Sequence, residues 1–367
     1  MASLQTLAIV KATVPVLEEH GTAITTVFYK NMFHEHPELL DIFNETNQKL
    51  GRQQTALAMT VLAAAKHLEN LATLLPQVTQ ISHKHRALQI LPEHYPIVGK
   101  HLLAAIKEVL GDAATDDILT AWAEAYDEIS SIFIQIEHGM YEQAIWQGFA
   151  PFIVTAKVEA ATDIAAFTVV PVNDHLVNNQ TIDLSKIKLS AGQYITVKTD
   201  PADSDHIALR HYSLYSANSD QGIQFAVRRD NRNEHNGLVS NYLHDHLAVG
   251  DTVLLSAPAG DFELDQDLVQ QNDIPLVLIS AGVGVTPILS MLEAQVTANP
   301  KRPVVWVYAC QNKEHHAFNS EVNKLLATAT NVEKHIFYFE SGQILNEACL
   351  SNLPKLADIY VCGSMPF

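Results

Sequence analysis

The spacing of apolar residues changes along the chain, and the changes divide it into regions. From residue 2 to about residue 146, apolar side chains recur every three or four positions, which is the spacing of amphipathic helices. Two of these stripes are Leu102, Leu103, Ile106, Val109 and Leu110, and Ile118, Leu119, Trp122, Tyr126, Ile129, Phe133 and Ile136. Each stripe must be buried against other helices, so the first third is predicted to be a helical domain spanning residues 1–147.

One helix in this region carries a histidine among its apolar positions. Leu74, Val78, Ile81, His85 and Leu88 follow helical spacing, so His85 is expected on the buried stripe. His83 is then expected to point toward solvent. On the residues alone, His85 could be a metal ligand or a core histidine hydrogen-bonded to a carbonyl.

The pattern changes near residues 147–151, where alternation replaces helical spacing. Phe152, Val154, Ala156 and Val158 are expected on one face of a strand. Further short strands are predicted at 167–172, 193–198, 212–217, 222–229 and 252–256. Short strands at such spacing favour an antiparallel β-barrel, assigned to residues 148–262.

The last region, residues 272–367, reads as an α/β domain. A strand at 276–280, a glycine turn at 282–286, a helix at 287–292 and a strand at 304–309 make a βαβ unit. Thr286 is expected to cap the helix and Pro287 to take its first position, leaving backbone amides for a pyrophosphate. The spacing departs from the three-glycine Rossmann fingerprint. The chain is thus expected to be multidomain: all-α, then antiparallel β-barrel, then α/β.

Composition narrows the possible partners. The chain has 41 acidic and 23 basic residues and a net charge of −18, which argues against nucleic acid and favours small molecules. Three scattered cysteines favour a reducing compartment. Lys11 and Glu18 rule out a signal peptide, and glycines and Pro287 interrupt the apolar stretch 276–292, so no membrane span is expected. We therefore expect a cytoplasmic protein.

Several segments of the first third resemble the bacterial hemoglobin and flavohemoglobin family. They are residues 11–15, 28–30, 58–65, 94–99 and 104–112. The resemblance implies a heme b, with His85 as its proximal iron ligand, Phe43 against the porphyrin and Lys84 among the cofactor-binding residues. It places Tyr29 and Gln53 in the distal pocket where a diatomic gas binds. Otherwise Tyr29 would be an amphipathic core residue and Gln53 a solvated one.

The resemblance also assigns Tyr95 and Glu137 to the proximal side of the heme. There the carboxylate would accept a hydrogen bond from the second nitrogen of His85, which raises the electron density on the iron. The alternative is that Glu137 is an exposed helix carboxylate near His138.

The barrel region resembles the flavin-binding signature of the ferredoxin-reductase superfamily. The signature consists of Arg210, His211, Tyr212 and Ser213, followed by residues 236–243. It implies that Arg210 pairs with the FAD diphosphate, Tyr212 stacks on the flavin and Ser213 bonds near its reactive nitrogen. The remaining cofactor-binding assignments are Tyr194, which could also be an ordinary strand residue, and Val239 and Ser240 at a helix start.

The glycine turn follows this signature in the order typical of the superfamily and implies an NAD(P)H site. Its residues are Gly282, Val283, Gly284, Val285, Thr286 and Pro287, with Cys362 and Gly363 after a later strand. Segments 308–312 and 316–318 fit flavohemoglobins as well. The sequence leaves the choice between NADH and NADPH open.

Together these features predict a nitric oxide dioxygenase that acts on NO and O2 with NAD(P)H, as a monomer or weak dimer. The alternatives are a reductase of free flavin, ferric chelates or quinones, and a gas-binding globin with an impaired reductase. The family pattern continues beyond Phe367 with a helix and a strand that carry an aromatic against the flavin. We therefore expect a truncated fragment or a variant with uncovered apolar sheet surface. The polar stretch 230–235 is expected to bulge into solvent.

Overall fold

The computed structural model describes residues 3–43, 51–172, 176–177, 180–201, 204–231 and 237–364. The chain divides into two compact units, one of Met1–Ala144 with Ala202–Leu209, the other of Ile145–Pro201 with Arg210–Phe367. Most of the polar stretch 230–235, for which a bulge was predicted, lies outside the described residues. In the part of the chain that is described, no helix combines the length and the apolar character needed to cross a bilayer.

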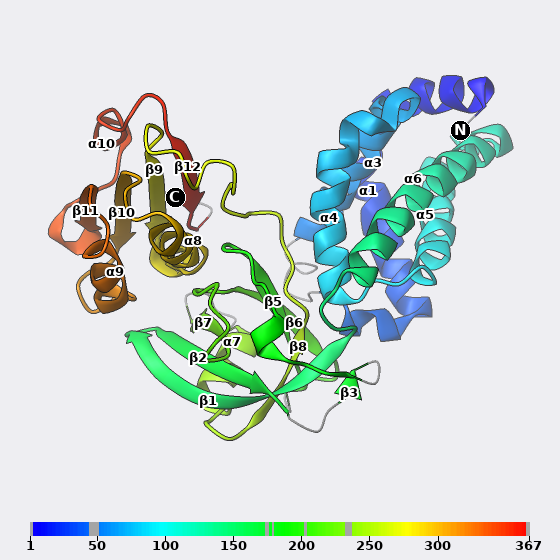
Figure 1. The fold of residues 1–367 in the computed structure, drawn as a ribbon. Helices are drawn as coiled ribbons and strands as arrows, with labels where there is room; N and C mark the ends of the chain where they lie inside the picture. Colours follow the sequence, from blue (N-terminus) through cyan, green and yellow to red (C-terminus); the bar gives the residue numbers. More distant parts are fainter. Residues whose placement is uncertain are drawn as a thin grey trace. The chain divides into compact units, whose positions relative to one another are not determined.

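The first unit is built from helices, as predicted (Figure 1). They are α1 (Leu4–Glu35), η1 (Pro37–Asp41), α3 (Arg52–Lys66), η2 (Leu68–Leu74), α4 (Leu75–Leu88), α5 (His94–Leu110), η3 (Gly111–Ala113) and α6 (Asp116–Glu142). The side chain of Ser3 caps α1 and that of Thr115 caps α6, each accepting a hydrogen bond from a backbone amide of the first turn. The apolar stripes meet in one core around Phe28, Leu102 and Trp122.

Helix α4 turns the predicted stripe toward the interior, but its side chains are less buried than expected. Its buried residues are Ser82, Arg86 and Ala87, and the stripe that includes His85 is only half-buried. The reason is that Leu74, Val78 and Ile81 face a small apolar cavity between α3, α4 and α6 rather than packed side chains. His83, which was expected to point toward solvent, is also half-buried.

The second unit begins with an antiparallel sheet. Its strands are β1 (Phe149–Ala161), β2 (Ile164–Pro171), β5 (Tyr194–Thr199), β6 (Ala208–Ser213), β7 (Ile223–Arg228) and β8 (Thr252–Ser256), in the order β6-β5-β8-β1-β2-β7. A bridge between Leu214 and Phe225 joins the two ends of this order, which closes the sheet into the predicted barrel. The short elements β3 (Leu176–Val177), β4 (Gln180–Thr181), η4 (Leu184–Lys186) and α7 (Leu238–Asp245) lie between the strands in sequence. The strand predicted at 212–217 lies instead at Ala208–Ser213.

A β-bulge in β1 corrects another prediction. Phe152 and Val154 are buried as expected, but the register shifts between Val154 and Ala156. Beyond the shift Lys157, rather than Val158, pairs with Phe167, and its ammonium lies 5.5 Å from the centre of that ring. Val158 is therefore 58% exposed, and the prediction that it shares the buried face was wrong.

A parallel sheet forms the rest of the second unit (Figure 1). Its order is β11 (Val332–Tyr338), β10 (Val304–Cys310), β9 (Leu276–Ala281) and β12 (Asp358–Cys362). The associated helices are η5 (Gly282–Gly284), α8 (Val285–Ala298), α9 (Asn319–Leu326), η6 (Phe339–Ser341) and α10 (Glu347–Leu350). The predicted βαβ unit is confirmed in β9, α8 and β10. On the edge strand β12, Ile359 and Val361 are about half exposed, so apolar sheet surface is uncovered there as expected.

Candidate functional site

Three helices of the first unit bring His85, Tyr95 and Glu137 together. Glu137, on α6, is 3% exposed, and its Oε1 accepts hydrogen bonds from the Nδ1 of His85 and the hydroxyl of Tyr95, both at 2.7 Å. The carboxylate fixes Nδ1 as the protonated nitrogen, so Nε2 keeps its lone pair. Burial, and then the charge of Glu137, raise the pKa of Tyr95, which keeps its hydroxyl a donor. Glu137 is thus a buried partner of His85 and not an exposed helix carboxylate.

Residues that the sequence analysis did not single out hold this network in place. The hydroxyl of Tyr126 donates to the carbonyl oxygen of Tyr95 at 2.6 Å, and that of Tyr141 donates to the carbonyl oxygen of Ile90 at 2.8 Å. The Tyr126 ring lies so close to Gly99 that an added Cβ would stand 2.6 Å from it. In the sequence, Tyr126 appeared only as one member of an apolar stripe. No pattern in the sequence signals the role of its hydroxyl.

Tyr29 and Phe43 form a second, aromatic group. Tyr29, on α1, is 7% exposed, and its ring centre lies 5.8 Å from that of Phe43 and 5.7 Å from that of Phe33. No described residue accepts or donates a hydrogen bond at the Tyr29 hydroxyl. Burial raises the pKa of Tyr29, so the phenol stays protonated. A buried donor without a protein partner is suited to a ligand.

The two remaining predicted residues of this unit lie at the edge of these groups. Gln53 is half-buried near the start of α3, and Lys84 is exposed on α4 beside His85. The structure therefore brings together His85, Tyr95 and Glu137, and separately Tyr29 and Phe43.

The donor set and its surroundings fit a heme. The side chain of His85 is 30% exposed, and its Nε2 makes no hydrogen bond within the described residues. Phe43, Leu57, Val61 and Val98 pack against the helical core while staying half-buried, as apolar side chains do when they line a space for an apolar group. An imidazole with one held nitrogen and one free nitrogen suits axial ligation.

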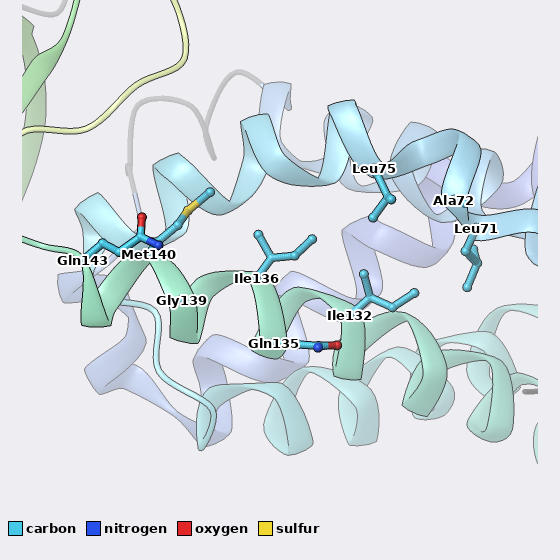
Figure 2. Close-up of a pocket in the computed structure, with 9 residues that line it drawn as sticks. All are labelled: Leu71, Ala72, Leu75, Ile132, Gln135, Ile136, Gly139, Met140 and Gln143. Carbon is cyan, nitrogen blue, oxygen red and sulfur yellow. The ribbon is translucent and has the colours of Figure 1, made fainter. Parts of the chain in front are cut away.

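A separate apolar groove runs along α6 (Figure 2). It has a volume of about 620 Å³ and is lined by Leu71, Ala72, Leu75, Ile132, Gln135, Ile136, Gly139, Met140 and Gln143. None of the residues predicted to bind a cofactor or to take part in catalysis lines it, so we do not assign it to the heme.

In the second unit, β5 and β6 place several predicted flavin residues close together. The Nδ1 of His211 lies 2.8 Å from the Oγ1 of Thr196, and its ring centre is 4.8 Å from that of Tyr194. Gly260 has a φ of +120°, and a Cβ there would lie 3.0 Å from the Tyr194 ring. The barrel backbone thus fixes the position of Tyr194 against His211.

The other residues of the β6 signature alternate along the strand. The ring of Tyr212 stacks at 6.0 Å on that of Phe225, and burial raises its pKa. Arg210 and Ser213 are half-buried on the same strand. These side chains fit a flavin in their chemistry, since they combine a cation, an aromatic face and a hydroxyl.

Helix α7 begins at Leu238, one residue before the predicted start. Val239 is buried, and the Ser240 hydroxyl accepts from the amide of Asp230 and donates to the carbonyl of Gly237, both at 3.2 Å. A Cβ on Gly237 would lie 2.6 Å from the Ser240 oxygen. Ser240 therefore connects Asp230 and Gly237 to the first turn of α7.

The glycine turn packs on the end of strand β12. Gly282 has a φ of +53°, and a Cβ on Gly284 would lie 2.3 Å from the carbonyl oxygen of Cys362 and 2.9 Å from the Cα of Gly363. The hydroxyl of Tyr308 donates to the Gly282 carbonyl at 3.3 Å. The fold thus brings the turn, Cys362 and Gly363 together, and a side chain at position 284 does not fit at this contact.

The start of α8 corrects the predicted helix cap. The helix begins at Val285 with Gly284 as its N-cap, because the turn of η5 runs directly into it. The hydroxyl of Thr286 donates to the carbonyl of Val283 at 3.0 Å and does not cap the helix. Pro287 is the third helical residue rather than the first, where a missing amide hydrogen is still tolerated.

Arg228 is a further candidate that the sequence analysis missed. It ends β7, and its Nη1 lies 3.6 Å from where a Cβ on Gly282 would stand. A guanidinium beside a glycine turn is suited to a nucleotide phosphate. In the sequence, Arg228 appeared only as a residue within the strand predicted at 222–229.

Fold and site geometry together define a class of protein: a helical heme domain joined to a flavin and nicotinamide oxidoreductase. Three family models match the chain in that order, "Globin" at residues 26–133, "Oxidoreductase FAD-binding domain" at 173–264 and "Oxidoreductase NAD-binding domain" at 278–367. The chain belongs to the flavohemoprotein family. The matched domains confirm the cofactor set predicted from the sequence, which is heme with FAD and NAD(P)H.

Similarity to known members extends over the whole chain. It is 42% identical to a flavohemoprotein of Bacillus subtilis, covering 100% of the chain and 92% of the relative. It is also 42% identical to flavohemoprotein A of Dictyostelium discoideum, with the same coverage. A flavohemoglobin from Malassezia yamatoensis, solved with bound FAD and heme, superimposes with a TM-score of 0.86 at 26% identity, covering 100% of this chain and 93% of that one.

Proposed function

We propose that the chain is an NAD(P)H-dependent nitric oxide dioxygenase, which converts NO and O2 to nitrate. The observation that carries the proposal is the 2.7 Å hydrogen bond from the Nδ1 of His85 to the buried carboxylate of Glu137. A carboxylate in this position makes the imidazole a stronger electron donor than a neutral carbonyl would, which favours oxygen activation over simple gas storage.

When bound, the heme supplies the iron for the chemistry between O2 and NO, and FAD converts the hydride of NAD(P)H into single electrons. In our proposal Nε2 of His85 holds the iron, and Glu137 and Tyr95 set the orientation of its ring. Phe43 contacts the porphyrin and Lys84 assists in binding it. This network keeps the Nδ1 proton in place through the reaction.

With heme bound, Tyr29 and Gln53 would act as hydrogen-bond donors to the gas. The Tyr29 phenol is buried and protonated, and in such apolar surroundings a hydrogen bond to a polar ligand is stronger than in water. It stabilises negative charge that develops on the ligand.

For the second unit we propose that Arg210, His211, Tyr212, Ser213, Tyr194, Val239 and Ser240 bind FAD. Residues 282–287, Cys362 and Gly363 bind NAD(P)H through the backbone of the turn. The corresponding domains are residues 1–147, 148–262 and 272–367. We also propose that the protein is a cytoplasmic monomer or weak dimer, in keeping with its three free thiols.

The test is NO consumption by the full chain loaded with heme and FAD. We expect consumption that requires both O2 and NAD(P)H. Tyr29→Phe should lower it about 100-fold, because one hydrogen-bond donor to developing charge is lost. Ferricyanide reduction by NAD(P)H should not change. Tyr338→Phe, which alters a tyrosine outside the proposed sites, is the matched control.

Each other outcome counts against the proposal. NO consumption that is unchanged in Tyr29→Phe would remove the role of Tyr29. Rapid NAD(P)H oxidation without NO consumption would indicate the flavin, ferric or quinone reductase. Reversible O2 binding with negligible NAD(P)H oxidation would indicate a gas-binding globin.

A further inference from the structure

Three potential metal ligands meet where α1 ends. Glu35 is the last residue of α1, His36 follows it, and His101 lies on α5, which packs against α1. One ligand atom from each of the three side chains lies within 4.8 Å of the other two. The proposed function uses none of these residues.

The buried member of this cluster has an unused nitrogen. His101 is 2% exposed, and its Nε2 is buried without a hydrogen-bond partner. The nearest charged group is the carboxylate of Glu35, whose Oε2 stands 3.6 Å away. A buried polar atom without a partner is rare, and it points to a missing ligand.

His36 is held as metal-binding histidines usually are. Its Nδ1 lies 3.0 Å from a carboxylate oxygen of Glu38, which leaves Nε2 for a ligand. A carboxylate on the second nitrogen is the typical arrangement behind a coordinating imidazole. The ring centres of His36 and His101 lie 5.5 Å apart, with the rings nearly perpendicular.

We propose that Glu35, His36 and His101 bind a divalent transition metal ion of the Zn²⁺ type, with water completing the coordination. Two imidazoles and one carboxylate suit zinc, whereas magnesium and calcium prefer oxygen ligands alone. The ligand atoms must close in to reach bonds of about 2.0–2.2 Å. Glu35 can do so because its side chain is 52% exposed. The ion would tie the end of α1 and the start of η1 to α5.

Lys100 competes with the ion for the same carboxylate. Its Nζ lies 2.7 Å from Oε2 of Glu35, and its side chain is 64% exposed. Metal binding must displace this ammonium, which can move into solvent. Removing the Lys100 charge should therefore tighten metal binding, whereas removing a ligand should weaken it.

The experiment uses the full chain with heme and FAD. Each variant is dialysed against zinc sulfate and then against metal-free buffer, and zinc and iron are measured by inductively coupled plasma mass spectrometry. Isothermal titration with zinc gives the affinities. We expect about one zinc ion per chain at this site. Glu35→Gln and His101→Gln should lose it, Glu38→Gln should weaken it about tenfold, and Lys100→Met should tighten it.

His20→Gln is the matched control, because His20 is an exposed histidine beside a glutamate on the same helix. It should bind zinc like the wild type. The heme and flavin absorbances report whether each variant folds. If His101→Gln does not fold, Glu35→Gln alone tests the zinc site, because Glu35 is exposed. Equal zinc content in wild type and Glu35→Gln, or loss in His20→Gln, would overturn the proposal.

Discussion

The histidine network of the helical unit and the glycine turn of the α/β region position their groups in opposite ways. In the first, side chains from α4, α5 and α6 meet in a chain of hydrogen bonds around Glu137. In the second, the backbone itself makes the contact, because a Cβ on Gly284 would lie 2.3 Å from the carbonyl oxygen of Cys362. We therefore expect the histidine network to be sensitive to substitutions that change a functional group but keep the side-chain volume. We expect the glycine turn to be sensitive to substitutions that add side-chain volume.

The largest expected effect is that of His85→Ala. Removing the only proposed axial ligand should abolish the heme absorbance and NO consumption, while the flavin absorbance and ferricyanide reduction persist. Optical spectra and an NO electrode measure this. His138→Ala, a histidine that is 70% exposed on α6, is the control and should keep the heme. Heme that is retained in His85→Ala would show that another residue holds the iron.

Gly284→Val should damage the second unit and leave the first intact. Its side chain would overlap the carbonyl oxygen of Cys362, so the turn must move, at a cost of about 1–3 kcal/mol in the free energy of unfolding. We expect a higher KM for NAD(P)H and slower ferricyanide reduction with an unchanged heme spectrum. Gly139→Ala, where an added Cβ has open space, is the control. A normal KM in Gly284→Val would show that the turn does not contact the nucleotide.

Glu137→Gln tests chemistry at nearly constant volume. The amide can still accept from His85, but the negative charge is lost. We expect heme binding to persist and NO consumption to fall about tenfold, together with a lower iron–histidine stretching frequency in resonance Raman spectra. If neither the rate nor the frequency changes, the charge of Glu137 has no influence on His85.

The smallest expected effect concerns the thiol of Cys362. Burial raises its pKa, so the thiolate forms only at alkaline pH and labelling by a maleimide should speed up as pH rises from 7 to about 9. NADP⁺ or NAD⁺ should slow labelling of Cys362 about threefold by covering the turn. Cys349, which is half-buried outside the proposed site, is the internal control in peptide mass spectrometry. Equal protection of both thiols would contradict a nucleotide site beside Cys362.

Elements with a strong period could be predicted from the sequence. The helices, the barrel strands and the βαβ unit follow from spacing alone, because one face of each must be buried. Where the prediction of an element failed, a local irregularity of the backbone had changed the spacing of its buried residues. The bulge after Val154 moved Val158 to the surface, and η5 moved the helix start upstream of Thr286.

The candidate sites were predictable to different degrees. The glycine turn is contiguous in sequence, so it could be recognised, whereas its contact with Gly363 depends on the sheet order. Glu137 and Tyr95 lie 42 residues apart, and neither stands out without the resemblance. Periodicity does not reveal the roles of Arg228, of the Tyr126 hydroxyl or of the Glu35, His36 and His101 cluster, because these roles come only from tertiary packing.

Gly99 shows how a position without any functional group can limit which substitutions this chain tolerates. The Tyr126 ring occupies the space that a side chain at this position would fill, and the same tyrosine supports the backbone of Tyr95. In a scan of all substitutions, Gly99 should therefore behave like a catalytic position. A substitution score that treats glycine to alanine as conservative would therefore predict too small an effect for Gly99→Ala.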